Sequence, residues 1–343
     1  MPRKLKQLKK LKEQVLVITG ASSGIGLTTA EMAVERGARV VMAARSQDEL
    51  RETAERLNRR GKRASFVEAD VADEDAVQRI AKHAVAEFGG FDTWVNNAGI
   101  SIYGRLTDVP MTDKRRVFET NFWGTVYGCK AAVKHLRQHG GTIINVGSVV
   151  SEFSIPLQGI YSASKQAVKG YTDALRMELE EAGVPIWVTL VKPGAIDTPF
   201  PEHARKYIPH QAKHTPPVYP PEEVANAILR SAEKPVREVF VGGGGRLQAA
   251  VSTVAPRLAD LYLEKTAIRG QQMTDDQTYR SMRAVSDDAL WKPSNDRRRR
   301  GQYPGRVMSS SLYTRAVLSD AARAFPFVAL GLLVATGVAA TRR

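Results

Sequence analysis

A glycine-rich turn near the N-terminus constrains the fold of this 343-residue chain more than any other feature. Residues 15–18 read VLVI, which is typical of a buried parallel strand. The turn TGASSGIG follows at 19–26, and a helical pattern then runs to Gly37, a residue suited to a helix C-cap. Glycines let the backbone approach a pyrophosphate, and a helix N-terminus offers free N–H groups. The turn therefore predicts a dinucleotide-phosphate site, although its glycine spacing differs from the common G-x-G-x-x-G. The candidate phosphate-binding residues are Gly20, Ser22, Ser23, Gly24, Ile25 and Gly26.

Strand-like and helical segments alternate along the first 240 or so residues. Further strands are expected at 40–43, 64–67, 93–95, 142–146, 186–191 and 238–241, with helices at about 47–60, 112–138, 160–181 and 222–232. This alternation favours a parallel sheet with right-handed crossovers. We therefore predict an α/β fold: a single Rossmann-like, doubly wound domain with a seven-stranded parallel sheet, followed by a C-terminal extension that is helical or disordered.

A tyrosine and a lysine lie four residues apart in YSASK at 161–165, and Ser148 precedes the tyrosine by thirteen residues. Residues four apart share one face of a helix. The Lys165 ammonium should favour the Tyr161 phenolate, so we expect the tyrosine pKa to fall from about 10 toward the working range. Such a phenol passes protons near neutral pH. A lone pair of this kind is weak evidence, because a solvated helix face gives the same pattern.

Several further motifs occur in an order that resembles the short-chain dehydrogenase/reductase family. They are TGASSGIG at 19–26, NNAG at 96–99, Asn121, Ser148, YSASK at 161–165 and Pro193-Gly194, and together they span about residues 14–242. The resemblance implies an enzyme that interconverts a carbonyl and an alcohol with a nicotinamide cofactor. Two other functions stay open: a non-catalytic, membrane-tethered nucleotide-binding scaffold, and epimerase or dehydratase chemistry on nucleotide sugars. A scaffold needs no proton relay, and the sugar-modifying enzymes carry another glycine spacing and a larger substrate domain.

The resemblance assigns roles to four catalytic candidates. Ser148 hydrogen-bonds the substrate carbonyl, and Tyr161 donates its proton to the developing alkoxide or removes it in reverse. Lys165 lowers the tyrosine pKa and holds the nicotinamide ribose hydroxyls. Asn121 holds a water that links Lys165 to solvent, which would explain an asparagine inside a long helical pattern.

The resemblance also assigns the remaining cofactor contacts. Asp70 and Val71 are expected at the adenine, Asn97 at the adenosine ribose, and Thr198 beside the nicotinamide carboxamide, while Asn96 braces the sheet. Pro193 and Gly194 shape the nicotinamide wall, and Tyr161 and Lys165 complete the set.

The end of the second strand indicates which cofactor is used. NAD-dependent enzymes place an acidic residue there for the ribose 2′-hydroxyl, whereas a nearby arginine suits a 2′-phosphate. Here Ala44 stands in the acidic position and Arg45 follows it. A guanidinium makes bidentate contacts with phosphate. We therefore predict NADP(H) as the cofactor.

The net charge of +14 is concentrated at the two ends of the chain. Residues 1–13 form a basic segment, residues 292–343 are also strongly basic, and the region between them is nearly neutral. Nucleic-acid binding usually requires a basic folded face and a recognisable motif, so we expect no nucleic-acid partner. We expect a small-molecule substrate and assembly as a dimer or tetramer. The single cysteine, Cys129, excludes an intrachain disulfide and fits a reducing compartment.

Two segments beyond the motifs carry weaker signals. Residues 199–221 are rich in proline and contain three histidines, which we interpret as a polar lid with solvated histidines and without a metal. After the catalytic domain (14–244), residues 245–264 predict an amphipathic helix bent at Pro256. Its apolar stripe could dock on the lid, a second subunit or a membrane surface. Residues 265–320 predict a polar linker or disorder.

The C-terminal end, 321–343, contains an uncharged run at 324–341 with arginines on both sides. A bilayer core needs about 17–25 apolar residues, so the run is marginal. We predict a membrane segment with the catalytic domain on the cytoplasmic side; a buried or subunit-docking helix is the alternative. No signal peptide is expected, because the apolar residues from Val15 belong to the first strand. A membrane location favours a lipophilic substrate.

Overall fold

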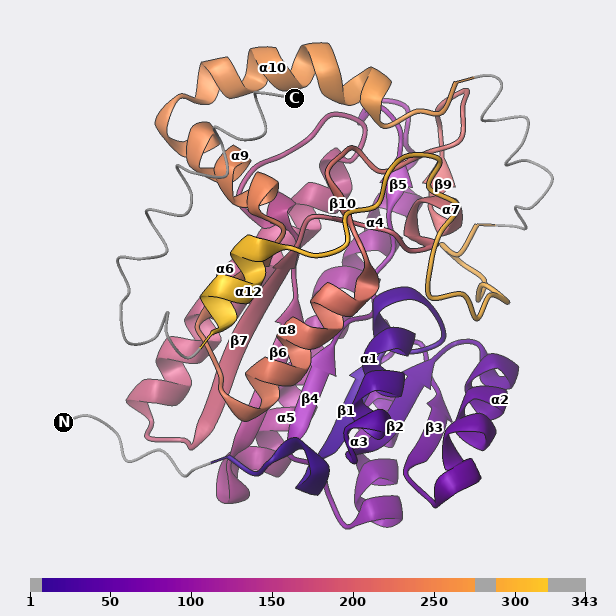
Figure 1. Cartoon of the computed structure of the whole chain (residues 1–343), viewed down its shortest axis with the longest axis vertical. Helices are drawn as coiled ribbons and strands as arrows, with labels where there is room; N and C mark the ends of the chain where they lie inside the picture. Colours follow the sequence, from indigo (N-terminus) through magenta and orange to yellow (C-terminus); the bar gives the residue numbers. More distant parts are fainter. Residues whose placement is uncertain (1–7, 275–287, 320–343) are drawn as a thin grey trace.

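A seven-stranded, fully parallel sheet forms the centre of the chain in a computed structural model that describes residues 8–274 and 288–319 (Figure 1). The strand order β11-β7-β6-β4-β1-β2-β3 reverses direction around β1 and β4, as in a doubly wound sheet. The predicted fold class is therefore confirmed. The strands are β1 Val15–Thr19, β2 Arg39–Ala44, β3 Ala64–Glu68, β4 Thr93–Asn96, β6 Gly141–Val146, β7 Ile186–Pro193 and β11 Glu238–Val241.

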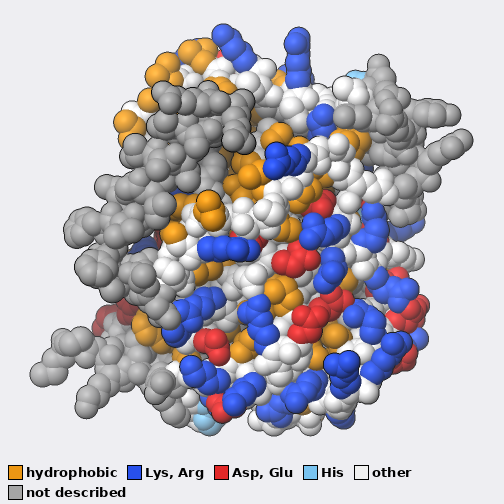
Figure 2. All heavy atoms as spheres, in the orientation of Figure 1, with side chains coloured by type: hydrophobic (Ala, Val, Ile, Leu, Met, Phe, Trp, Pro, Cys, Tyr) orange, Lys and Arg blue, Asp and Glu red, His pale blue; other side chains and the backbone are white. Residues whose placement is uncertain are grey.

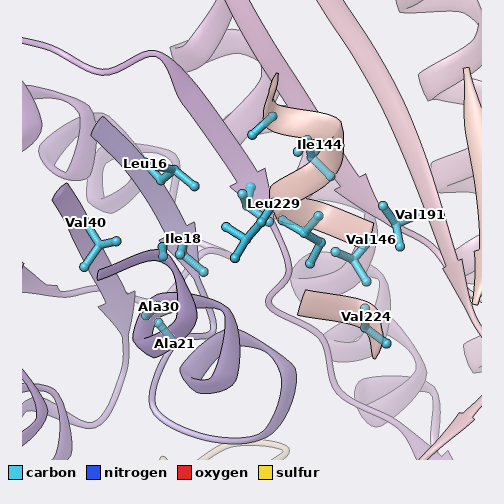
Figure 3. Close-up of a cluster of buried hydrophobic side chains, with 14 of the residues drawn as sticks. Leu16, Ile18, Ala21, Ala30, Val40, Ile144, Val146, Val191, Val224 and Leu229 are labelled. Carbon is cyan, nitrogen blue, oxygen red and sulfur yellow. The ribbon is translucent and has the colours of Figure 1, made fainter. Parts of the chain in front are cut away.

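Helices cover both faces of the sheet and bury its side chains. Successive residues of β1 alternate between the two faces: Leu16 and Ile18 enter one apolar cluster, whereas Val15 and Val17 enter the other. Figure 3 shows part of the first cluster, where the side chain of Leu229 extends from its helix toward the strands. The helices on that face are α1 Gly24–Glu35, α2 Gln47–Leu57 and α8 Pro221–Glu233, and those on the other are α3 Glu74–Phe88, α5 Gly124–His139 and α6 Gly159–Glu181.

The single helix expected at about 112–138 is divided into three pieces. Helix α4, Met111–Phe118, is followed by one π-helical turn, Glu119–Trp123, and only then by α5. Such π-helical turns inside α-helices often occur at functional sites. Here the turn contains Asn121, whose side chain bonds a neighbouring loop instead of solvent.

Short elements lie above the carboxyl ends of the central strands. They are β5 Ile102–Tyr103, β8 Ala195–Ile196, α7 Phe200–His203, β9 Arg205–Lys206 and β10 Val218–Tyr219, with 3-10 turns at Leu11–Glu13, Asn58–Arg60 and Val149–Ser151. Strand β5 pairs with β9 and β8 pairs with β10, so the proline-rich 199–221 region is tied to the body of the domain.

The C-terminal extension differs from the expected helix and linker. The amphipathic segment forms two helices, α9 Gly243–Val254 and α10 Pro256–Gly270, because the residue before a proline avoids helical geometry and Ala255 is accordingly non-helical. The predicted linker at 265–320 is structured wherever it is described. Helix α10 continues into it, residues 288–311 lie against the catalytic domain, and α12, Leu312–Leu318, packs beside β11.

The ends of the chain are only partly described. Leu11, in the basic N-terminal segment, is buried against the core, and Lys9 forms an ion pair with Asp92. Among the described residues, none of the helices combines the length and apolar character that a bilayer crossing requires. The run at 324–341, on which the predicted membrane segment rests, lies outside the described residues.

Candidate active site

A cavity of about 210 Å³ opens at the carboxyl edge of the sheet, where ligands bind in open α/β folds. It brings together fifteen of the seventeen residues that the sequence singled out, from segments far apart in the chain. They are Gly20, Ser22, Ser23, Gly24, Ile25, Arg45, Asp70, Val71, Asn97, Ser148, Tyr161, Lys165, Pro193, Gly194 and Thr198. Gly26 and Asn121 do not line it.

The glycine turn is packed so closely that side chains would not fit. Gly20 has a φ of +67°, and a Cβ on Gly26 would lie 2.1 Å from the Gly20 carbonyl oxygen. Asn97 fixes the turn from below, since its Nδ2 donates to the carbonyl oxygens of Thr19 at 2.9 Å and Gly20 at 3.2 Å. Gly26 therefore allows the helix to approach the turn and does not face the cavity.

Ser148, Tyr161 and Lys165 meet at the inner end of the cavity. Ser148 follows β6, and its Oγ donates to the Pro193 carbonyl oxygen at 3.4 Å while lying near enough to the Tyr161 phenol to lower its pKa. Lys165 lies one turn along α6 with its Nζ 5.8 Å from the centroid of the tyrosine ring, and it donates to the Val146 carbonyl oxygen at 2.8 Å. All three side chains are thus held against the end of one strand.

Burial controls the ionisation of this group. It raises the pKa of Tyr161 to about 12, and the Ser148 hydroxyl opposes this rise only in part. Burial also lowers the pKa of Lys165 to about 8. The expected fall in the tyrosine pKa is therefore wrong for the chain by itself, because the loss of water disfavours the phenolate more than its neighbours stabilise it.

Asn121 is completely buried behind the cavity and joins three segments. Its Oδ1 accepts from the Ile100 N–H at 2.8 Å, and its Nδ2 donates to the Ile100 carbonyl at 2.9 Å and to Ser164 Oγ at 3.0 Å. A Cβ on Gly99 would lie 3.4 Å from Asn121 Oδ1 and 3.5 Å from Lys165 Nζ. The asparagine and the lysine therefore both lie against Gly99, and the asparagine amide is committed to the loop after NNAG.

The opposite end of the cavity is basic. Arg45 donates to the carbonyl oxygens of Ala289 at 2.5 Å and Leu290 at 3.3 Å. Asp70 accepts from Arg116, so its carboxylate is paired before any ligand arrives. Asn96 bonds Asn145 at 2.9 Å inside the sheet, which confirms the bracing interpretation.

Sequence reasoning missed the part of the cavity wall that the C-terminal extension supplies. Ala289, Pro293 and Ser294 line the cavity although they fall within the range expected to be a linker. The one available signal was the run RRRR at 297–300, whose charges meet carboxylates of the domain.

Two histidines of the expected lid also line the cavity instead of facing solvent. His203 bonds Asp296 at 3.1 Å, and burial lowers the pKa of His214 to about 4. Across the described ranges, no His, Cys, Asp or Glu side chains gather in a group suited to a metal ion.

The arrangement fits a nicotinamide dinucleotide. The turn leaves no room for side chains, the N-terminus of α1 faces the cavity, and an arginine stands at one end with a Ser-Tyr-Lys group at the other. When bound, such a cofactor supplies or accepts the hydride.

Comparison with known proteins agrees with this geometry. The family model described as short chain dehydrogenase matches residues 14–208. "Uncharacterized oxidoreductase YxnA" of Bacillus subtilis (strain 168) is 46% identical over 313 residues, covering 90% of this chain and 86% of that protein. The match leaves about a tenth of the chain uncovered, which is fewer residues than the 42 that follow Gly301. It therefore includes the segment around Ala289 and the arginine run.

Two solved structures have the same fold as this chain, and each of them contains a bound dinucleotide. An alcohol dehydrogenase from Thermococcus sibiricus complexed with 5-hydroxy-NADP is 28% identical, with a TM-score of 0.59 over 66% of this chain and 95% of that one. A short chain dehydrogenase/reductase from Burkholderia phymatum in complex with NAD is 25% identical, with a TM-score of 0.64 over 78% of this chain and 100% of that one. The chain belongs to the short-chain dehydrogenase/reductase family of nicotinamide-dependent oxidoreductases.

Proposed function

We propose that this protein is an NADP(H)-dependent oxidoreductase that interconverts a carbonyl and an alcohol on a lipophilic substrate, with Tyr161 as the general acid/base. The observation that carries the proposal is the shared cavity: Ser148, Tyr161 and Lys165 line the same space as the glycine turn. A hydroxyl, a phenol and an ammonium within one water-poor site are the groups needed to orient a carbonyl and to protonate it.

In this mechanism Ser148 orients the substrate oxygen and Tyr161 gives it a proton. The Tyr161 pKa of about 12 keeps the phenol protonated at neutral pH, as carbonyl reduction requires. Lys165, whose pKa burial lowers to about 8, still carries its proton at pH 7 and offers N–H donors to the ribose hydroxyls. Asn121 fixes the loop that borders Lys165.

The preference for NADP(H) rests on the residues at the end of β2. Ala44 provides no carboxylate for a ribose 2′-hydroxyl, and Arg45 provides a guanidinium that lines the cavity. A second arginine, Arg116, lies at this end, but its charge is paired with Asp70, which leaves Arg45 as the cation that lines the cavity there. Both features favour a 2′-phosphate over a hydroxyl.

The lipophilic substrate is supported by the apolar wall near Tyr161. Phe200 lies with its ring centroid 5.5 Å from that of Tyr161, and Ile100, Ile196 and Pro199 also line the cavity. Apolar walls with few placed polar groups are typical of sites for apolar ligands.

Turnover of a ketone series tests the proposed activity. Purified full-length protein with NADPH should reduce ketones of increasing chain length, followed by loss of NADPH absorbance, with a higher kcat/KM for the longer members. Repeating the assay with NADH measures cofactor preference. A protein that binds NADPH but turns over none of the ketones, and shows no oxidation of the matching alcohols, would instead favour the non-catalytic scaffold.

We also propose attachment to a membrane through residues 321–343 and assembly as a dimer or tetramer. The first rests on the uncharged run at 324–341 with its flanking arginines. The exposed apolar side chains of α9 and α10, including Val254 and Leu258, are consistent with either contact. Light scattering in detergent measures the oligomeric state.

A further inference from the structure

Residues 288–301, which we call the C-terminal strap, cross the cavity along its length. The strap begins beside Arg45, passes the N-terminus of α1 and ends against Thr198. Figure 1 shows this gold segment at the side of α7 and β9, above α2. Its path follows the direction in which an extended dinucleotide would lie, from the basic end to the tyrosine end.

The strap is anchored at the basic end through its own backbone. The Leu290 carbonyl oxygen accepts from both Arg45, at 3.3 Å, and Arg116, at 3.1 Å. Trp291 adds a hydrogen bond from its indole N–H to Asp113 at 3.1 Å, and the Arg116 guanidinium lies 5.3 Å from its ring centroid. Arg45, which also lines the cavity, is thus shared between the expected cofactor site and the strap.

The strap also touches the glycine turn and the nicotinamide end. The Arg298 carbonyl oxygen accepts from the Gly24 N–H at 3.0 Å, which is one of the free helix N-terminal donors. Ser46 Oγ donates to the Ser294 carbonyl at 2.9 Å. A Cβ on Gly301 would lie 2.5 Å from the Thr198 carbonyl oxygen, so the strap backbone rests directly on that residue.

Four consecutive arginines hold the outer side of the strap to different elements of the domain. Arg297 pairs with Glu52 of α2, Arg298 with Glu202 of α7 at 2.6 Å, Arg299 with Glu31 of α1 at 3.2 Å, and Arg300 with Glu222 of α8 at 3.0 Å. Figure 2 shows acidic and basic side chains interspersed on this face. The arginine side chains are 39–49% exposed, so salt can reach and partly screen these pairs, although Glu31 and Glu202 are themselves buried. Such a set can hold the strap and still release it.

The strap forms part of the wall of the space in which a dinucleotide would lie. Pockets that bury drug-sized ligands measure about 300–1,000 Å³, and a dinucleotide is larger than most such ligands. The cavity measures about 210 Å³, and Ala289, Pro293 and Ser294 of the strap form part of its wall. A dinucleotide larger than this space would therefore press against the strap.

We propose that the C-terminal strap is a cofactor clasp: it closes over the bound dinucleotide through the four arginine ion pairs, and its opening limits the rate of cofactor release. This rests on nicotinamide-dinucleotide binding at the proposed site, and it applies to NADPH and NADH alike. The clasp adds Ala289, Pro293 and Ser294 to the cofactor site and gives the RRRR run a function.

Stopped-flow measurement of NADPH dissociation from the full-length protein tests the clasp. In Arg299→Ala/Arg300→Ala the dissociation rate should rise at least tenfold over the wild type, because two of the four arginines that pair with the domain are lost without changing a residue that lines the cavity. The control, Arg269→Ala/Arg306→Ala, removes two exposed arginines from the same extension and should stay within twofold. Melting curves show whether each variant is folded.

A second measurement needs no variant. Raising NaCl from 0.05 to 0.5 M should accelerate NADPH dissociation from the wild type severalfold, and less in Arg299→Ala/Arg300→Ala. Sodium sulfate at the same ionic strength should accelerate NADPH dissociation to the same extent as NaCl. Equal acceleration distinguishes charge screening from a specific anion effect.

Three results would overturn the clasp. One is a dissociation rate in the double variant within twofold of the wild type. Another is a faster association with unchanged dissociation, since that would make the strap a competitor of the cofactor. The third is a wild-type rate that salt does not change. Wild-type protein that binds neither NADPH nor NADH contradicts the proposed function itself, and equilibrium fluorescence titration detects that separately.

Discussion

Lys165 donates from its buried Nζ to the carbonyl oxygen of Val146 at 2.8 Å. This contact places an ammonium group in a site where burial lowers its pKa to about 8 from an ordinary value of 10.5. Holding the proton there costs free energy, so the group needed for catalysis destabilises the fold.

We predict that Lys165→Met abolishes turnover but raises the free energy of unfolding at pH 7, by up to about 3 kcal/mol. The pKa of Lys165 is lower in the folded than in the unfolded protein. Below pH 8 the folded wild type therefore carries the full free-energy cost of burying the charged ammonium. The cost shrinks as pH rises from about 8 to 10.5, where the folded lysine is already neutral. Urea unfolding of both proteins between pH 6 and 10 measures this. A variant less stable than the wild type at pH 7 would show that the Val146 hydrogen bond outweighs the burial cost.

Tyr161→Phe should reduce kcat at least 100-fold while NADPH still binds. The ring and its packing 5.5 Å from Phe200 are retained, and only the transferable proton is lost, which is typically worth 10²–10⁴-fold. Tyr127→Phe, outside the cavity, is the matched control and should retain the wild-type rate. If the Tyr161 variant keeps more than about a tenth of the wild-type kcat, another group protonates the substrate.

Asn121→Ala should destabilise the protein by about 1–3 kcal/mol, because the N–H and carbonyl of Ile100 would both lose a buried partner. Denaturant unfolding measures the change, with the less buried Asn226→Ala as control. We also expect lower activity, since the loop that borders Lys165 loses its support. Unchanged stability would mean that the Ile100 groups find replacement partners.

Arg45→Gln should weaken NADPH binding at least tenfold and leave NADH binding within about twofold. Glutamine keeps an N–H donor for the strap carbonyls but removes the charge that a 2′-phosphate would meet. Fluorescence titration with both cofactors gives the ratio. Equal affinities of the wild type for NADPH and NADH would contradict the assignment of NADP(H).

The motifs indicated the catalytic end of the site because each is local in sequence. Tyr161 and Lys165 share one helix turn, and the glycine turn needs its glycines for short-range steric reasons. The period-2 alternation of β1 between two cores likewise follows from strand geometry.

The contribution of the C-terminal extension could not be read in the same way. Arg45 meets Ala289 across 244 positions, and it does so through a backbone carbonyl that any residue type provides. The direction in which the Tyr161 pKa shifts could not be predicted from the sequence either. Burial decides that direction, and burial depends on the assembled site.

The last prediction concerns residues 322–343, which follow the described part of the chain. Removing them should move the protein from the membrane fraction to the supernatant, with turnover of a water-soluble substrate unchanged, because the cavity and the strap are complete by Gly301. Leu333→Arg keeps the length of the chain and places a charge within the uncharged run, at a cost of about 2.5–3.5 kcal/mol for insertion near a helix centre. It should therefore release the protein as the truncation does, whereas the control Leu333→Ile should not. Full-length protein found in the supernatant without detergent would exclude anchoring. Unfolding of the truncated protein would instead show that this segment packs within a protein core.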